Sequence, residues 1–411
     1  MKAALTSLGC RLNQAEIEEL GRRLSRLGAE IVPPDGEADV YIVNTCTVTH
    51  IADRKSRNLI RRLKREHPRS LVLATGCYAE RASEELRRAG ADLVIGNKEK
   101  EEIPLRISDI FDLRDEEALK SPPRLRTRAF IKIQDGCDQF CSYCIVPFVR
   151  GRERDVPPQK IIAAIREREA EGYKEVVLTG TQIGSYRTEG GLAHLLRRIL
   201  KETRIPRIRL SSIHPQSLTE ELLSLWEDRR LCRHLHIPLQ SGSDAILRKM
   251  RRPYTTDQFR KAVELARSYI PDLAITTDVM VGFPGEGERE FEESLAFCRE
   301  MKFASIHTFI FSPRPGTAAA SMPDDVPYEE KKRRSKLIRE LSRSGWLEFA
   351  QRFLNGVLDV LWEEREGELW SGYTSNYLRV CARSEREICN EILPAKLLEI
   401  RGDRIFGVIS K

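Results

Sequence analysis

Three cysteines at the spacing C-x3-C-x2-C are the residues of this chain best suited to chemistry. Cys137, Cys141 and Cys144 lie within eight residues, in the segment DGCDQFCSYC. A closed structural zinc site takes four ligands, so three thiolates fit it poorly. A four-iron cluster held by three cysteines leaves one iron free to bind a substrate or cofactor, and such clusters serve as electron donors. The motif therefore predicts a reactive iron–sulfur centre, and the alternative is zinc with a distant fourth ligand.

A second group of three cysteines follows from the pattern of the first 110 residues. Alternating strand and helix patterns there predict an open parallel sheet. Cys10, Cys46 and Cys77 each come one or two residues after a predicted strand, at the sheet edge where ligands bind. We expect a second three-cysteine metal site, and the alternative is three unrelated buried cysteines. The expected strands are Lys2–Leu8, Ala38–Asn44, Leu71–Thr75 and Leu93–Ile95, with helices at 13–28, 50–66 and 81–89.

The middle of the chain repeats a strand–helix unit six times. Six parallel units predict a partial, open (βα) barrel, in which chemistry takes place at the carboxyl ends of the strands. The loop that carries Cys137, Cys141 and Cys144 follows the first of these strands. The expected strands are Ala129–Gln134, Glu175–Leu178, Arg207–Ser211, His234–Leu239, Ala274–Val281 and Ser305–Phe311.

The rest of the chain predicts a helix and a small third domain. Residues 325–350 have the pattern of a connecting helix, and five short strands after residue 352 predict a small antiparallel barrel. Ser121-Pro122-Pro123 cannot lie inside a helix or a central strand, which places a boundary within residues 103–128. The expected fold class is α/β, with domains at 1–115, 126–350 and 352–411.

Composition narrows the functional class. A chain of 411 residues buries a full core without disulfide staples. We expect a cytoplasmic protein, because no signal peptide is visible and no apolar run reaches the ~18 residues of a membrane span. Ten cysteines in a reducing compartment favour metal binding, and a net charge of +7 permits a nucleic-acid partner. Four cysteines are expected to be bystanders: Cys232, Cys298, Cys381 and Cys389.

Several short motifs, in a fixed order, carry a family resemblance. With the cysteine motif of residues 137–144, the chain resembles the radical S-adenosylmethionine methylthiotransferases over nearly its whole length. That family joins a three-cysteine domain, a radical domain and a C-terminal TRAM domain. The matching stretches are GCRLNQ at 9–14, NTCTVT at 44–49, TGCY at 75–78, RGRE at 150–153, HIPLQSG at 236–242, DVMVGFPGE at 278–286 and SPRPGT at 312–317.

The resemblance implies a reaction and its cofactors. One [4Fe-4S] cluster on Cys137, Cys141 and Cys144 would cleave S-adenosylmethionine to a radical that takes hydrogen from C2 of an adenine. A second [4Fe-4S] cluster on Cys10, Cys46 and Cys77 would present sulfur, and a second S-adenosylmethionine the methyl group. Such cofactor chemistry needs no Ser/His/Asp constellation.

The residues around Cys46 bear on the substrate. CTVT at 46–49, followed by ADRKSR at 52–57, is most similar to the branch that acts on N6-threonylcarbamoyladenosine at position 37 of tRNA. The alternatives within the family are isopentenyladenosine in tRNA and an aspartate of a small-subunit ribosomal protein. A zinc-containing RNA-binding protein without activity is the alternative from another class.

Further site residues are implied by the same resemblance. Tyr143 is expected to pack near the cofactor adenine, and Gly180 with Thr181 to meet the methionine amino group. Arg209 and Ser211 are expected to reach the methionine carboxylate, and Gln240 to shape the pocket. His214, His236 and His307 are interpreted as structural, because no ligand spacing pairs them.

A basic run indicates where RNA would bind. Arg54–Arg65 holds seven basic residues and no acid, which fits either phosphate binding or an ordinary solvated helix. Lys331–Arg343 is a second run of this kind, and Tyr373 and Tyr377 match a TRAM motif and either stack on bases or pack. The expected partners are a tRNA anticodon loop, whose base must be presented to the pocket, and a reductase or flavodoxin-type electron donor.

Overall fold

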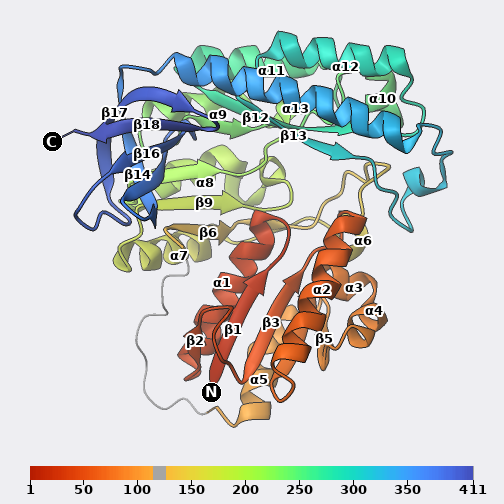
Figure 1. The fold of residues 1–411 in the computed structure, drawn as a ribbon, viewed down its shortest axis with the longest axis vertical. Coiled ribbons are helices and arrows are strands. Elements are labelled where there is room, and N and C mark those ends of the chain that lie inside the picture. The colour runs from red at the N-terminus through yellow and green to blue at the C-terminus, as the bar shows by residue number, and fades with distance from the viewer. Residues whose placement is uncertain (114–125, 411) are drawn as a thin grey trace.

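The computed structural model describes residues 1–113 and 126–410, which form three structural parts (Figure 1). An N-terminal sheet lies below an open barrel, and a small closed barrel packs against the amino ends of the open barrel's strands. The expected boundary at Ser121-Pro122-Pro123 lies outside the described residues. Within the described part of the chain, no helix is long and apolar enough to cross a membrane.

The N-terminal part is a five-stranded parallel sheet in the order β2-β1-β3-β4-β5. The central strand β3 is buried along its whole length, as expected for a sheet covered on both faces. Its elements are β1 (Lys2–Ser7), α1 (Arg11–Arg26), β2 (Glu30–Val32), β3 (Val40–Thr45), α2 (His50–Glu66), β4 (Leu71–Gly76), α3 (Cys77–Arg81), α4 (Ser83–Arg88), β5 (Leu93–Ile95) and α5 (Ile103–Phe111). The sequence did not predict the three-residue strand β2 or the short helix α3, and the helix expected at 81–89 is α4.

The central part is the six-stranded open barrel predicted from the sequence. The sheets β10-β9-β6 and β11-β12-β13 are parallel throughout. Two isolated parallel bridges, Ile208 with Leu231 and Ser212 with His236, link the two sheets between β10 and β11. The strands are β6 (Arg128–Lys132), β9 (Glu175–Thr179), β10 (Arg207–Leu210), β11 (His234–His236), β12 (Ala274–Val281) and β13 (Ser305–Ile310). A two-stranded hairpin of β7 (Gln134–Asp135) and β8 (Arg154–Asp155) brackets the cysteine loop after β6.

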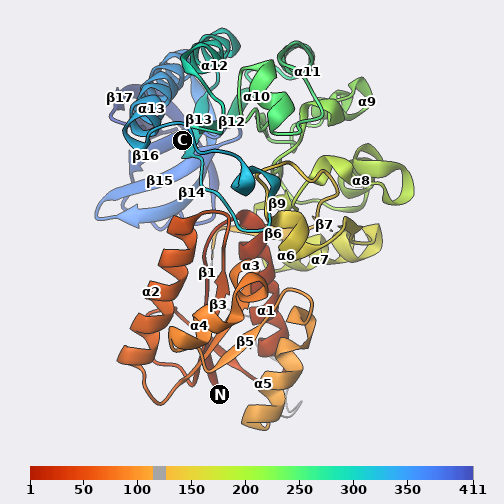
Figure 2. The same cartoon turned by 90° about the vertical axis from the view of Figure 1, so that its right-hand side faces the viewer.

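Helices cover the outside of the open barrel (Figure 2). They are α7 (Pro158–Ala170), α8 (Gly191–Glu202), α9 (Glu220–Leu223), α10 (Asp244–Lys249), α11 (Thr256–Tyr269), α12 (Glu288–Met301) and α13 (Tyr328–Gln351). The short helix α6 (Val146–Arg150) instead follows the cysteine motif and packs against Cys77 of the N-terminal part. Apolar side chains of these helices and of the strands form the largest core of the molecule. The start of α11 is fixed by a capping box, in which Thr255 and Gln258 each bond the other's backbone N–H.

The C-terminal part is a closed five-stranded barrel in the order β14-β15-β16-β18-β17. Four of its pairings are antiparallel, as predicted, and β16 runs parallel to β18. The strands are β14 (Val357–Glu366), β15 (Leu369–Thr374), β16 (Arg379–Arg383), β17 (Ile392–Arg401) and β18 (Arg404–Ile409). The long helix α13 connects this barrel to β13 across the outside of the open barrel (Figure 1).

Candidate active site

The N-terminal cysteines lie together at the carboxyl edge of the first sheet. Cys10 follows β1 and caps α1, Cys46 follows β3, and Cys77 begins α3 after β4. These three strands are neighbours in the sheet, so the residues after them meet. Gly9, at φ +96°, allows the close approach, since a Cβ there would lie 2.6 Å from the Cys46 Sγ. Asn97 Nδ2 lies 3.6 Å from the Cys77 Sγ and donates to it.

The second trio is held by the loop between β7 and β8. The Cys137 N–H donates to the Gly151 carbonyl at 3.1 Å, and the Cys144 N–H to the Cys141 carbonyl at 3.0 Å. Arg252 Nη1 lies 3.4 Å from the Cys141 Sγ. Burial raises the pKa of Cys144 to about 12 and that of Cys46 likewise to about 12, so these thiols stay protonated until a metal takes them as thiolates.

The two trios approach each other through one small apolar contact. Ile145, the residue after Cys144, packs with Val149 against Cys77 in a buried cluster. Asn97 spans the same junction, because its Nδ2 bonds both the Cys77 Sγ and the Val149 carbonyl, the latter at 2.8 Å. Cys77 of the first trio and the residue after Cys144 of the second are therefore in one buried cluster.

A buried ionic network fixes the two parts in this position. The Arg150 side chain, 3% exposed, donates to Asn13 at 2.6 Å, to Glu16 at 2.9 Å and to Asp135 at 2.8 Å. Burial acts to raise the pKa of Glu16, but Arg150 and Lys100 together hold it well below its ordinary value. Breaking such a buried pair is costly, so the network holds the N-terminal sheet in place against the cysteine loop.

Comparison with known proteins shows the family of this chain. The model of the Radical SAM superfamily matches residues 131–298, and that of the Uncharacterized protein family UPF0004 matches residues 2–96. The Threonylcarbamoyladenosine tRNA methylthiotransferase MtaB of Bacillus subtilis is 37% identical, over 96% of this chain and 93% of the relative. The chain belongs to the radical S-adenosylmethionine methylthiotransferase family. The resemblance predicted from the motifs is thus confirmed.

Relatives from two branches of the family match along the whole chain. MtaB of Thermotoga maritima is 36% identical, over 91% of this chain and 90% of the relative. The tRNA-2-methylthio-N(6)-dimethylallyladenosine synthase of Endomicrobium trichonymphae is 33% identical over 100% of both. Among solved structures, the radical S-adenosylmethionine methyltransferase TsrM of Kitasatospora setae has a TM-score of 0.57 at 14% identity, covering 77% of this chain and 76% of that one. At that identity the likeness shows the fold alone.

Enzymes of this family use S-adenosylmethionine with [4Fe-4S] clusters, and the carboxyl ends of β9 and β10 have donors and acceptors suited to such a cofactor. The Thr181 Oγ1 and Ser211 Oγ are buried there without a hydrogen-bond partner among the described residues. A buried polar atom of this kind usually has a partner. Gly180 adjoins them, and a Cβ there would lie 2.8 Å from the Gln134 carbonyl. These residues fit a polar ligand above the strands.

Tyr143 and Gln240 lie at the same face of the barrel. Tyr143 packs edge-on against Phe283, with 6.5 Å between ring centroids, beside a small apolar cluster. Gln240 has φ +71°, a conformation that costs free energy in a residue other than glycine. Its backbone is held by bonds to both Asp278 and Met280. A strained residue that is fixed from both sides at a strand end is typical of a functional site.

Arg209 is not available for the role expected of it. Its side chain is fully buried, pairs with Glu175 at 2.7 Å and donates to the Ser375 carbonyl at 3.0 Å. Its guanidinium carbon lies 4.6 Å from the ring centroid of Tyr377. Tyr377 belongs to the C-terminal part and packs at the amino end of the open barrel, against Arg128 and His234. The expectation that Arg209 reaches the methionine carboxylate is therefore corrected. Tyr377 packs inside the protein rather than stacking on RNA.

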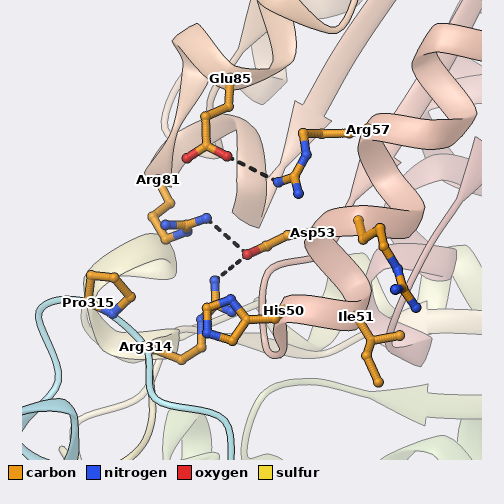
Figure 3. Close-up of a pocket in the computed structure, with 9 residues that line it drawn as sticks. His50, Ile51, Asp53, Arg57, Arg81, Glu85, Arg314 and Pro315 are labelled. Carbon is orange, nitrogen blue, oxygen red and sulfur yellow. Dashed lines mark hydrogen bonds and ion pairs between the residues drawn. The ribbon is translucent and has the colours of Figure 1, made fainter.

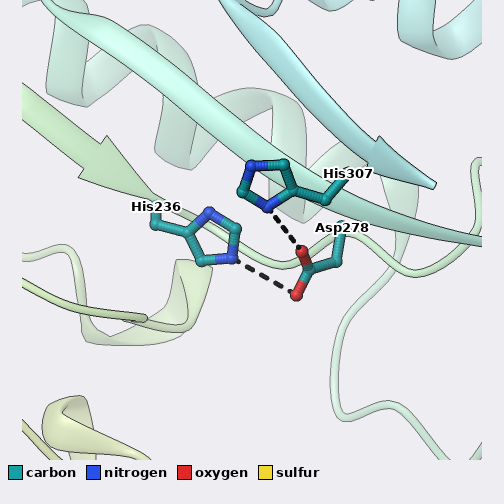
Figure 4. A group of neighbouring side chains, drawn as sticks. All are labelled: His236, Asp278 and His307. Carbon is teal, nitrogen blue, oxygen red and sulfur yellow. Dashed lines mark ion pairs between the residues drawn. The ribbon is translucent and has the colours of Figure 1, made fainter. Parts of the chain in front are cut away.

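Two histidines interpreted as structural form a cluster with Asp278 (Figure 4). His236 Nε2 lies 3.3 Å from one carboxylate oxygen and His307 Nδ1 3.4 Å from the other. Burial acts to raise the pKa of Asp278, but the two imidazoles hold it below its ordinary value. His236 Nδ1 also bonds the Thr276 Oγ1 at 2.9 Å. Both nitrogens of His236 thus have partners, so the group is a hydrogen-bonded chain across β11, β12 and β13.

These contacts explain what the sequence did not reveal. The register of β12 and β13 sets Asp278 opposite His307, a pairing that no spacing along the chain indicates. Arg252, which contacts Cys141, lies in no recognised motif and reaches the cluster loop from beyond α10. Of the four cysteines expected to be bystanders, Cys232, Cys298 and Cys381 are buried and Cys389 is exposed, all outside the two trios.

Proposed function

We propose that this enzyme methylthiolates C2 of N6-threonylcarbamoyladenosine in tRNA. The observation that carries the proposal is the approach of two three-cysteine groups, one at the edge of the N-terminal sheet and one at the mouth of the barrel, joined by Ile145 and Asn97. The names of the MtaB relatives support the choice of substrate. The dimethylallyladenosine branch is the second candidate, since a relative from it matches the whole chain.

In this proposal each trio holds one [4Fe-4S] cluster: Cys137, Cys141 and Cys144 at the barrel, and Cys10, Cys46 and Cys77 at the sheet. When bound, the clusters and S-adenosylmethionine supply the radical, sulfur and methyl group of the reaction. The protein contributes charge and position. Arg252 presents positive charge to the Cys141 thiolate, and Asn97 donates to the Cys77 sulfur. Such contacts orient ligands and tune a cluster.

The S-adenosylmethionine site of this proposal lies over β9 and β10. Thr181 and Ser211 offer free hydroxyls to the polar end of the cofactor, and Gly180 lets Gln134 pack closely against the strand end beside them. Tyr143 offers an aromatic edge, and Gln240 forms the opposite wall. Arg209 has no part in this site, because its guanidinium is bonded to Glu175 and the C-terminal barrel.

The remaining expectations belong to the same proposal. Domain boundaries at 1–115, 126–350 and 352–411 separate a cluster domain, a radical domain and a TRAM domain. The tRNA anticodon loop meets the exposed basic face of α2, where Arg54 and Lys55 point outward. The enzyme works in the cytoplasm with a reductase or flavodoxin-type electron donor.

Nucleoside analysis of tRNA from a deletion strain tests the proposal. We expect loss of 2-methylthio-N6-threonylcarbamoyladenosine, accumulation of its unthiolated precursor and unchanged levels of other thiolated bases. Restoration by the wild-type gene is the control. Loss of the methylthio-dimethylallyl nucleoside instead would transfer the chain to the second candidate. A colourless, iron-free protein after anaerobic purification would contradict both.

A further inference from the structure

A pocket of about 500 Å³ opens beside the N-terminal cysteines and has no role in the chemistry described above (Figure 3). It lies between the start of α2, the helices α3 and α4, and the loop after β13. Its wall contains four arginines and two acids, so positive charge is in excess. The charged side chains nearest one another in this wall are those of Asp53, Arg57, Arg81, Glu85 and Arg314.

Arg314 is the unusual residue of this pocket. It is 1% exposed, yet its Nε and Nη1 have no hydrogen-bond partner among the described residues. Only its Nη2 is bonded, to Asp53 at 2.5 Å and to the Thr47 Oγ1 at 3.2 Å. Buried donors without partners are costly and rare in native proteins. A ligand with acceptor oxygens would satisfy them.

Two further arginines strengthen the preference for an anion. Arg81 donates to the Thr47 Oγ1 at 2.8 Å and pairs with Asp53 at 3.1 Å, so Arg81 and Arg314 share one carboxylate (Figure 3). Arg57 pairs with Glu85 at 3.1 Å from the other wall. Guanidinium groups present paired donors that match the two oxygens of a carboxylate.

The pocket lies next to the expected reaction centre. Thr47, which both Arg81 and Arg314 contact, is the residue after Cys46. In adenine, C2 and C6 flank the same ring nitrogen, so a substituent on N6 lies beside the carbon that is modified. A base whose C2 faces the cysteines can therefore direct its N6 substituent toward this pocket.

We propose that this pocket binds the carboxylate of the threonylcarbamoyl group, with Arg314 as the main specificity residue. The proposal rests on the proposed function, because only a substrate with an acidic N6 substituent brings that charge. A backbone phosphate is the other source of an anion, but phosphates would meet the exposed side of α2 before this buried floor. An uncharged dimethylallyl group would leave the arginines unpaired, and a site built for hydrogen bonds rejects such analogues strongly.

Binding of matched RNAs to the cluster-loaded enzyme, without reductant, tests the proposal. Four anticodon stem-loops differ only at the target base: threonylcarbamoyladenosine, its neutral carboxamide, dimethylallyladenosine and adenosine. From fluorescence anisotropy we expect the wild type to prefer the acid over the amide by about 10- to 100-fold. Arg314→Gln should reduce that preference to near unity and Arg57→Gln should reduce it at least about threefold. Both should leave the affinity for the adenosine RNA within about twofold. Arg88→Gln, an exposed arginine of α4 outside the pocket, is the matched control and should retain the preference.

Each contrary result has its own meaning. If the variants bind all four RNAs equally less well, the pocket contacts a phosphate and the carboxylate proposal is wrong. If the acid and the amide bind alike to the wild type, the proposal is wrong even where the enzyme methylthiolates the acid. If the wild type modifies only the dimethylallyl RNA, the proposed function fails as well. Since Arg57 lies at the pocket rim, Arg57→Gln remains informative if Arg314→Gln does not fold or load iron.

Discussion

The two ends of the open barrel both contain buried arginines, but their donors differ in pairing. At the amino end, Arg209 bonds Glu175 and two carbonyls of the C-terminal barrel. Beside the carboxyl end, Arg314 is equally buried and leaves two nitrogens unbonded. Arg209 thus has its partners within the chain, whereas two nitrogens of Arg314 have none among the described residues. Pairing, more than burial, therefore distinguishes a structural arginine from a binding one.

Tyr377 is a second residue at the amino end whose partners lie within the chain. Its hydroxyl accepts from Arg11 at 3.1 Å and from Arg128 at 3.2 Å, and its ring stacks on His234 with 4.6 Å between centroids. Burial acts to raise the pKa of Tyr377, but the arginines around it lower the pKa overall. These contacts come from all three parts of the molecule. The C-terminal barrel therefore covers the amino end of the open barrel.

The largest effect should come from replacing a cysteine of the two trios, beside the carboxyl end of the open barrel. Cys46→Ser should lower iron from about eight to about four atoms per chain, because one of two four-iron clusters loses a ligand, and should abolish product formation. Iron analysis and nucleoside assays after anaerobic reconstitution measure both. Cys389→Ser, an exposed cysteine outside the trios, is the control. Equal iron loss in that control would remove the distinction between ligands and bystanders.

At the amino end of the open barrel, Glu175→Gln should lower the free energy of unfolding by about 3–5 kcal/mol. The substitution leaves Arg209 buried without its charge partner. Urea or thermal unfolding measures the change. Glu202→Gln breaks a partly exposed i,i+4 pair with Arg198 and should lower the stability far less than Glu175→Gln does.

Arg314→Gln provides the decisive contrast with Glu175→Gln. Asp53 keeps Arg81 as a partner in that variant, and two donors without partners are removed. The cost in stability should therefore be clearly smaller than that of Glu175→Gln. Equal destabilisation would show that both arginines are structural, and the comparison of the two ends would fail.

Much of this architecture could be predicted from the sequence, because strand ends and cysteines are local signals. The strand Ala274–Val281 was predicted at its observed bounds. Cys10, Cys46 and Cys77 each follow a strand as expected, and the loop with the other three cysteines comes after β6. The prediction that Arg209 contacts the methionine carboxylate was wrong for a physical reason. Its position in β10 indicates the barrel interior, but the segment that fills that interior is Thr374–Tyr377 of another part of the molecule. Hydrophobic periodicity carries no information about such distant partners.

Tyr377→Phe should have a smaller effect, a loss of about 2 kcal/mol, since the hydroxyl accepts hydrogen bonds from charged donors. The ring would still pack on His234. Tyr373→Phe is the matched control, because no hydrogen bond to the Tyr373 hydroxyl is present in the described part of the chain. Its cost should be within about 0.5 kcal/mol. Thermal unfolding of the two variants side by side tests whether the Tyr377 hydroxyl stabilises the contact between the C-terminal barrel and the open barrel.

The smallest expected effect concerns Glu18, a buried carboxylate of α1. It has an ion-pair partner, but its Oε1 accepts no hydrogen bond from a described residue. Among the residues that the structure describes, Glu18 pairs with Arg126 at 3.6 Å, and burial raises its pKa to about 7. A carboxyl group whose folded pKa exceeds its unfolded value binds more protons when folded, so its contribution to stability is lost as pH rises. We expect the wild type to lose about 1 kcal/mol between pH 6 and pH 8 through this group. Glu18→Gln should remove that part of the slope, and an unchanged slope in urea unfolding would show that Glu18 is charged at both pH values.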